Sequence, residues 1–455
     1  MRRLAVFFLS LSTCAAQSDT VDDPKALLLE VRRQVMSTLT RLPRYLCTET
    51  VDREMRRPGV PVDHESCDDL AGLQKTGRWK LSKSASDRLR LDVAVSADNE
   101  MYSWVGEERF QDRTLADLVG GGATSTGAFA TYLRSIFGSN DAQFTFLRGS
   151  PSSNERLVEF GFAMPLEKSH LTVGDRQRHA VVVYDGSFLV DRQTLSLVRL
   201  TVRALRVPVE LGVCSDTTTL DYEVKKLNES EFLLPKKAQF DVVSWNGNEL
   251  VNRTAFSSCH EFHGESALKF DVPSETDHGA PVRSSSIPQT VTGGLSFTIA
   301  LAQSLDPRTA AAGDLLKTKL TGPLRDRQKA VLASKGSLVL GRILQVEKLY
   351  GIYGPGVQSL RIGIRLESIE VNGATLPFRA QLSSLEKRRI TQISESHESR
   401  HVGTQDRLVR PEELGSFNQM INPADDGVGY LFFDDVTDEF IVRAGTQLSG
   451  TTLKP

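Results

Sequence analysis

Apolar and polar residues alternate with a helical period near the start of the chain and with a strand period over most of the rest. In residues 24–41 the apolar positions form a single stripe at helical spacing: Leu27, Val31, Val35 and Leu39. Asp22 and Asp23 precede this segment as capping residues, and Pro24 suits a first helical turn. We therefore expect a helix within the N-terminal segment 17–44, packed on a sheet through this stripe.

From residue 45 to about 270 the pattern becomes mainly β. Apolar positions in 89–95 alternate with polar ones, as in a strand with one buried face. Asp185-Gly186 between two apolar runs is typical of a hairpin, and Asp191–Thr194 predicts a second turn. Further strands are expected at 195–202, 217–224, 232–243 and 250–257. Consecutive strands with short turns predict an antiparallel meander. An inserted helix is expected at 126–137, after a glycine run and before Gly138.

A second β-rich domain is expected in the C-terminal part. Residues 271–290 are rich in Pro, Ser and charge, and we interpret them as a linker. In the domain that follows, 291–455, Asn372-Gly373 predicts a tight turn. Strands are expected at 295–301, 315–320, 337–346, 360–366, 369–371, 375–382, 430–433 and 440–442. Residues 384–426 are polar and predict a long insertion. The expected fold class is mainly β (α+β).

The first residues predict export. Arg2 and Arg3 precede an apolar run at 4–11 that is too short to span a bilayer, and small residues follow, so 1–16 is interpreted as a signal peptide. The alternative is a lipoprotein, because residues 11–14 resemble a lipobox that would anchor the chain through Cys14. We favour soluble export to the periplasm or medium, since Thr13 is unusual before a lipobox cysteine. No later run reaches 18 apolar residues, so no transmembrane span is expected.

Charge excludes one class of partner. The 455-residue chain has 55 Lys+Arg against 57 Asp+Glu, a formal net charge of −2, which argues against nucleic acid. Near the start of the β region the charges alternate in sign over Glu49, Asp52, Arg53, Glu54, Arg56 and Arg57. We interpret this cluster as a solvated surface that neutralises itself.

Four cysteines besides Cys14 predict two disulfides in an oxidising compartment: Cys47, Cys67, Cys214 and Cys259. Three connectivities are possible, and the most local one joins Cys47 to Cys67 and Cys214 to Cys259. A zinc site of four thiolates is the alternative, although the chain has no CxxC pair.

One segment matches a catalytic motif. His397-Glu398-Ser399-Arg400-His401 satisfies HExxH, in which two histidines one helical turn apart bind zinc and the glutamate polarises its water. The flanks are polar, and the guanidinium of Arg400 would oppose metal binding. We therefore interpret the segment as a polar loop and expect no cofactor, with a zinc hydrolase as the alternative.

Two features fit a binding site in the β region. Tyr102, Trp104 and Phe110 stand at even spacing and can line a ligand groove, although such aromatics more often belong to a core. The helix expected at 126–137 can act as a lid over the concave side of a sheet.

Two parts of the chain resemble known families. The meander containing DGSFLVDRQTLSLVRLTV (185–202) resembles exported carriers of the LolA/RseB kind. That resemblance implies an antiparallel half-barrel around one or two helices, able to hold acyl chains. The segments AAGDLLKTKLTGPL (311–324), SKGSLVLGRI (334–343) and RAGTQLSGT (443–451) resemble the C-terminal domain of TrbI-type secretion core-complex proteins, which implies a small β-barrel. RLPRYLCTETVDRE (41–54) is similar to exported proteins of Acidobacteria, which indicates a lineage and no activity.

These observations predict an exported, non-catalytic protein that binds a ligand or organises the cell envelope. A half-barrel carrier would hold a lipid or another apolar envelope molecule and expose an apolar concavity to solvent. A protein partner in the envelope is also expected. A purely structural interaction module is a further alternative.

Overall fold

The computed structural model describes residues 23–262 and 291–454. Short gaps interrupt these ranges at 60–62, 78–79, 97–98, 108–109, 111–113, 120–123, 150–155, 176, 352–357, 386–406, 410–426 and 438. Three segments lie outside the described residues: 1–16 with Cys14, interpreted as a signal peptide; 271–290, interpreted as a linker; and the HExxH residues 397–401. Within the described part, no helix is long and apolar enough to cross a membrane.

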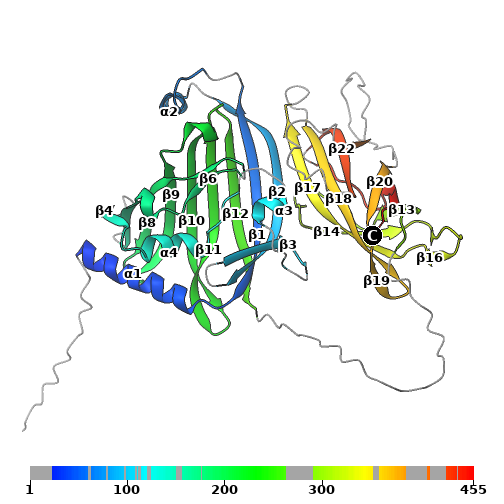
Figure 1. Cartoon of the computed structure of the whole chain (residues 1–455), viewed down its shortest axis with the longest axis horizontal. Coiled ribbons are helices and arrows are strands. Elements are labelled where there is room, and N and C mark those ends of the chain that lie inside the picture. The colour runs from blue at the N-terminus through cyan, green and yellow to red at the C-terminus, as the bar shows by residue number, and fades with distance from the viewer. Residues whose placement is uncertain are drawn as a thin grey trace, which may run out of the picture.

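The first lobe is a long antiparallel sheet with a few short helices (Figure 1). Its helices are α1 (Pro24–Arg41), α2 (Cys67–Lys75), α3 (Leu115–Val119) and α4 (Thr131–Phe137), with single 3-10 turns at Leu166–Lys168 and Val209–Leu211. Its strands are β1 (Tyr45–Pro58), β2 (Leu81–Ser96), β3 (Asn99–Trp104), β4 (Gln143–Gly149), β5 (Leu157–Met164), β6 (Thr172–Gly174), β7 (His179–Val181), β8 (Val183–Asp191), β9 (Ser196–Leu205), β10 (Val213–Leu227), β11 (Ser230–Ser244) and β12 (Glu249–Glu261).

The strands of this sheet follow a meander with one long-range insertion. Ladder pairing runs β4-β5-β8-β9-β10-β11-β12, so neighbours in the sheet are close in sequence. Beyond β12 comes β1, the first strand of the chain, which then pairs with β2, and β2 pairs with β3. All these pairings are antiparallel. The expectation of a mainly β, antiparallel fold is confirmed.

The second lobe is a smaller antiparallel sheet. Its strands are β13 (Ser296–Leu301), β14 (Leu315–Leu320), β15 (Leu324–Arg325), β16 (Val331–Ala333), β17 (Leu338–Tyr350), β18 (Gln358–Val371), β19 (Ala374–Pro377), β20 (Ala380–Leu385), β21 (Arg407–Val409), β22 (Val428–Val436) and β23 (Gln447–Thr452). Pairing runs β20-β23-β13-β14-β17-β18-β22-β21. Among the described residues no ladder joins β20 to β21 or β22, so the sheet is not closed and the expected barrel is wrong.

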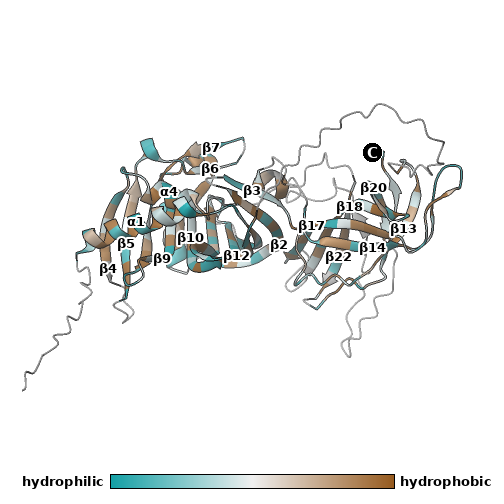
Figure 2. Cartoon of the chain, turned by 90° about the horizontal axis from the view of Figure 1, so that it is seen from below, coloured by the Kyte–Doolittle hydropathy of each residue, from teal (hydrophilic) through white to brown (hydrophobic). Residues whose placement is uncertain are grey.

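Helices α1 and α4 lie on one face of the first sheet (Figures 1 and 2). Asp23 caps α1 by accepting a hydrogen bond from the backbone N–H of Lys25 at 3.0 Å. The predicted stripe of α1 is buried, and it packs with Leu133, Ile136 and Phe137 of α4 against strands β5, β8, β9 and β10. The expected helix in 17–44 is therefore present at Pro24–Arg41. The helix expected at 126–137 begins later, at Thr131, after a turn over 128–130.

Local signals succeeded at one turn and failed at another. Asn372 and Gly373 have φ angles of 50° and 79° and connect β18 to β19, as the sequence predicts. Asp185-Gly186, in contrast, is no hairpin, because β8 runs straight through it. A Cβ at Gly186 would lie 1.8 Å from the Thr201 carbonyl oxygen and 2.8 Å from the Phe162 ring. This glycine is needed for close packing within the sheet.

The expectation of two disulfides is confirmed, but the most local pairing is wrong. Cys47 bonds to Cys259, and Cys67 bonds to Cys214. The pairing of β1 with β12 brings the first strand of the chain beside a strand more than 200 residues later. Cys47 and Cys259, which are 212 residues apart in the sequence, lie on these two strands. Each sulfur is bonded to another, so none is a thiolate ligand for the four-cysteine zinc alternative.

Strand β2 joins the two lobes directly. One edge of β2 pairs with β1, and its other edge pairs with both β3 and β17. Between those two contacts, the N–H of Arg90 donates to Ala312 O at 2.7 Å, and the N–H of Ala312 donates to Arg88 O at 2.8 Å. Gly313 allows this approach, since a Cβ there would lie 2.1 Å from the Arg90 carbonyl oxygen. The lobes are therefore hydrogen-bonded to each other as well as joined by the chain.

Candidate functional site on the concave face of the first sheet

One face of the first sheet carries a continuous set of inward-pointing side chains. In β1 every second residue from Tyr45 to Met55 points to this face, because side chains alternate along a strand. The register places Glu49 opposite Leu91 of β2 and opposite Phe256 of β12. The face is otherwise mostly apolar around Glu49. We call it the concave face, the side on which α1 and α4 lie.

A turn before α4 fills part of the concave face. Phe129 lies in this turn and is 1% exposed. Its ring contacts Phe256 edge-on at a centroid distance of 5.0 Å and Tyr45 at 5.9 Å. An aromatic ring therefore occupies the space that a carrier would offer to an apolar ligand.

Hydrogen bonds from the sheet hold this turn in place. The carboxylate of Glu100 in β3 accepts from the N–H of Gly127 at 2.8 Å and from the N–H of Phe129 at 3.2 Å. Tyr102 OH donates to the same carboxylate at 2.7 Å, and Tyr222 OH donates to the carbonyl oxygen of Ala128 at 3.1 Å. No ladder pairing attaches the turn to the sheet among the described residues. Its position therefore depends on these side-chain hydrogen bonds and on the burial of Phe129.

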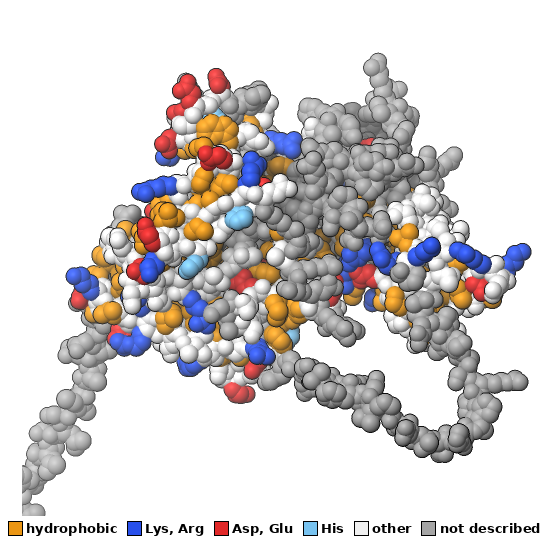
Figure 3. All heavy atoms as spheres, in the orientation of Figure 1, with side chains coloured by type: hydrophobic (Ala, Val, Ile, Leu, Met, Phe, Trp, Pro, Cys, Tyr) orange, Lys and Arg blue, Asp and Glu red, His pale blue; other side chains and the backbone are white. Residues whose placement is uncertain are grey.

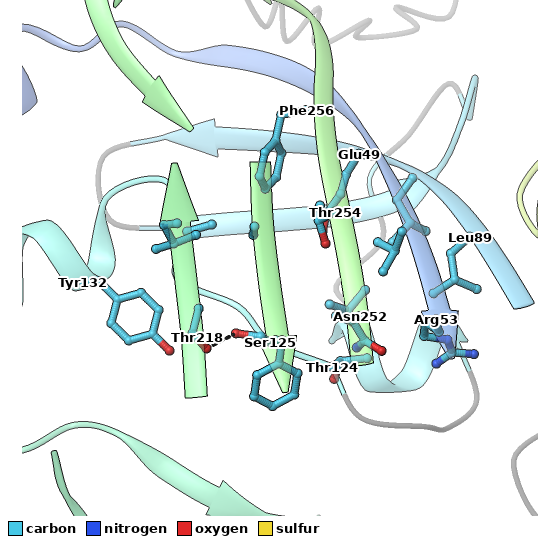
Figure 4. Close-up of a pocket in the computed structure, with 17 residues that line it drawn as sticks. Glu49, Arg53, Leu89, Thr124, Ser125, Tyr132, Thr218, Asn252, Thr254 and Phe256 are labelled. Atoms are coloured by element: carbon cyan, nitrogen blue, oxygen red, sulfur yellow. Dashed lines mark hydrogen bonds between the residues drawn. The ribbon is translucent and has the colours of Figure 1, made fainter. Parts of the chain in front are cut away.

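A small cavity remains beside the turn (Figure 4). It measures about 30 Å³, which has room for one or two water molecules and none for an acyl chain. Its lining combines apolar side chains with Glu49, Asn252 and several hydroxyls, two of which, Ser125 and Thr218, are 3.4 Å apart. The solvent-facing apolar concavity expected of a carrier is absent from this arrangement of the described residues.

Glu49 is the most unusual group in the cavity. It is 6% exposed, and its carboxyl accepts no hydrogen bond from the described residues. Burial, reinforced by the negative charge of Glu100, raises the pKa of Glu49 to about 8. The carboxyl is therefore mainly protonated at neutral pH. The interpretation of Glu49 as part of a solvated surface is wrong, because β1 turns it inward.

The groove candidates from the sequence have other positions. Tyr102 and Trp104 are buried in the core of the first sheet, together with Tyr45 and Phe129, and neither lines the cavity. Phe110 is half-buried and does not line it either. His397, Glu398 and His401 lie outside the described residues, so the zinc alternative stays a prediction. Elsewhere in the described part, no group of three or more His, Cys, Asp or Glu side chains could hold a metal ion.

Sequence reasoning missed the residues that build the site. Glu49 and Glu100 are single acidic residues on strands, and Phe129 precedes its helix. The strand period of Tyr45, Cys47, Glu49 and Val51 was the available signal, because it places a carboxyl among inward positions.

Comparisons with known proteins give little further information. No family model and no curated protein matches the chain. Among solved structures, a LolA superfamily protein from Nitrosomonas europaea aligns with 52% of this chain and 94% of its own, at 9% identity and a TM-score of 0.24. A similarity of this quality carries no conclusion about the ligand or activity of this chain.

Proposed function

We propose that the protein binds an apolar ligand on the concave face of its first sheet, without catalysis, after the turn with Phe129 moves away. The observation that carries this proposal is that the ring of Phe129 fills the concave face. Phe129 is buried between two aromatic rings, yet its turn is attached by the hydrogen bonds of Glu100 and Tyr222. A ligand that replaces the ring therefore has few hydrogen bonds to break.

The surroundings of the ring suit such a ligand. Apolar side chains from strands β1, β2, β10 and β12 line the cavity: Val51, Leu89, Leu91, Leu220 and Phe256. The protonated Glu49 adds a hydrogen-bond donor without adding a charge. The two disulfides fit an oxidising compartment outside the cytoplasm.

A dye-binding experiment tests this proposal. We expect the wild type to bind N-phenyl-1-naphthylamine and Phe129→Ala to bind it about tenfold more tightly, since removing the ring removes about 1.5–3 kcal/mol of competing apolar burial. The readout is energy transfer to the dye from tryptophan, because Trp104 and Trp245 lie in the first lobe.

Phe297→Ala is the matched control. Phe297 is a buried ring of the second lobe, with an edge-on contact to Phe378 at 5.2 Å, so its removal leaves a comparable space away from the concave face. Equal gains in the two variants would mean that any new cavity takes up the dye. That result, or no binding by both wild type and Phe129→Ala, would refute the proposal.

A further inference from the structure

A second cleft lies on the opposite face of the same sheet, at the junction of the two lobes. In β1 the residues between the inward ones point away from the concave face, and they include Asp52 and Glu54. The register places Asp52 opposite Arg88 and Arg253, and Glu54 opposite Ser86. Ser86 is in turn opposite Lys348 of β17 in the second lobe. Three strands of the first lobe and one of the second therefore contribute to one outer surface, which we call the junction cleft.

The junction cleft has a volume of about 220 Å³ and a polar lining. Five cationic side chains belong to it: Lys83, Arg88, Arg253, Arg308 and Lys348. The carboxylates on this side are Asp52, which pairs with Arg88 at 2.6 Å, Glu54, and Asp306, which pairs with Arg308 at 2.7 Å. Arg53 and Asp87 also border the cleft, but they pair with each other. The cationic groups therefore exceed the carboxylates by two.

Two cations of the cleft, together with Arg56 beside it, stabilise the carboxylate of Glu54. Its carboxylate lies 2.7 Å from Arg56, 3.6 Å from Arg253 and 3.8 Å from Lys83. Burial by itself would raise the pKa of Glu54, but these three cations lower it below the ordinary value. The surface already stabilises one negative charge of the protein itself.

Lys348 acts on Asp306 only through its charge, which contributes to lowering the pKa of that carboxyl, and it can contact a further anion. It is half-buried at the junction and makes no ion pair within 4.0 Å with any described residue. The Ser86 and Tyr350 hydroxyls are 3.2 Å apart beside it, and the ammonium of Lys83 lies 4.9 Å from the centre of the Tyr350 ring. Ammonium, guanidinium and hydroxyl donors in one cleft form the donor set that binds a phosphoryl group.

We propose that the junction cleft binds a phosphoryl anion, either as inorganic phosphate or as the phosphate of a lipid headgroup. Its volume is smaller than that of a typical small-molecule site, which suits a single anionic group better than a large ligand. Because both lobes supply donors, the bound anion contacts both and holds them together. The site lies mainly across the sheet from the concave face, with Arg53 lining both the cavity there and this cleft, and it does not require an apolar ligand.

Titration calorimetry with inorganic phosphate on the full chain tests this site. Lys348→Gln removes the cation that has no ion pair to lose, and we expect it to weaken phosphate binding about tenfold. Lys83→Gln serves as a second variant with the same expectation. Binding by the wild type should weaken as sodium chloride is added, because the interaction is electrostatic.

Lys319→Gln is the matched control, since Lys319 is an exposed lysine of β14 with no ion pair among the described residues. Its affinity should stay within about twofold of wild type. Phosphatidylcholine vesicles with and without phosphatidylglycerol distinguish the sources: binding to the anionic vesicles alone assigns the headgroup, and binding to free phosphate assigns the inorganic ion. No binding to either ligand, or an equal loss in Lys319→Gln, would overturn the proposal.

Discussion

Each lobe buries a glutamate whose pKa is raised by burial, and the two differ in their hydrogen-bond partners. Glu347 in the second lobe is 1% exposed, and it accepts hydrogen bonds from Arg361 and Gln345, both at 3.0 Å. Glu49 in the first lobe is nearly as buried, but its carboxyl has no such partner among the described residues. Buried charges in proteins are normally paired, because desolvation is costly. Glu347, with one carboxylate oxygen paired to Arg361 and Gln345 and the other without a partner among the described residues, fits a structural role, whereas Glu49 lowers stability when it is ionised.

The core around Glu347 is more completely packed than the surroundings of Glu49. The second lobe has one large cluster of aliphatic and aromatic side chains, and the Thr318 hydroxyl within it donates to Val339 O. The concave face of the first lobe instead keeps a cavity, two acidic residues and a turn held by side-chain hydrogen bonds. Incomplete packing next to an unpaired acid is typical of a binding site rather than of a region built only for stability.

The largest effect is expected from breaking the paired glutamate. Glu347→Leu leaves the buried Arg361 guanidinium without this carboxylate, and the free energy of unfolding should fall by about 4 kcal/mol. Urea unfolding measures this, with amide hydrogen exchange to localise the loss to β17 and β18. The double replacement Glu347→Leu/Arg361→Met should recover much of the stability, because it removes both charges. A double variant as unstable as the single one would show that the pair is not what Glu347 contributes.

Replacing the unpaired glutamate, Glu49, should increase the free energy of unfolding instead of lowering it. Glu49→Gln should raise the free energy of unfolding at pH 9 by on the order of 3 kcal/mol, because above about pH 8 it removes a carboxylate that is ionised in a buried site. The pKa of Glu49 is raised in the folded state, so its contribution is favourable below about pH 4.5 and is lost as pH rises through about 8. The gain should therefore grow between pH 4.5 and 8 and then stay constant.

The difference between wild type and Glu49→Gln isolates this residue. Burial also raises the pKa of Asp216 to about 6 and that of Glu347 to about 7, so the wild type alone loses stability over an overlapping range. Urea unfolding by tryptophan fluorescence, repeated from pH 4 to pH 9, measures the difference. A gain independent of pH would mean that Glu49 is already ionised in the folded protein.

Short-range patterns were enough to find most strands, but not the site. The alternation in 315–320 gives the bounds of β14, and the stripe of α1 gives its buried face. Gly186 was misread as a turn because the reason for it is Phe162 on a neighbouring strand, which no local pattern contains. The pairing of Cys47 with Cys259 and the burial of Glu49 both follow from β1 lying between β12 and β2. That placement brings distant parts of the chain together. The charged residues next to Glu49 in the sequence therefore led to the wrong prediction that its side chain is exposed to solvent.

The smallest expected effect concerns the tether of the turn. Glu100→Gln keeps one acceptor oxygen but loses the negative charge that strengthens the hydrogen bonds from Gly127 and Phe129, so stability should fall by about 1–2 kcal/mol. The sharper readout is amide hydrogen exchange of residues 127–130, which should speed up while exchange in β17 and β18 stays unchanged. Glu223→Gln is the control, because Glu223 makes only exposed ion pairs with Lys225 and Lys236 and should cost less than about 0.5 kcal/mol. Unchanged exchange at 127–130 would show that the apolar contacts of Phe129 alone keep the concave face closed. A ligand would then have to displace a ring whose turn does not open easily.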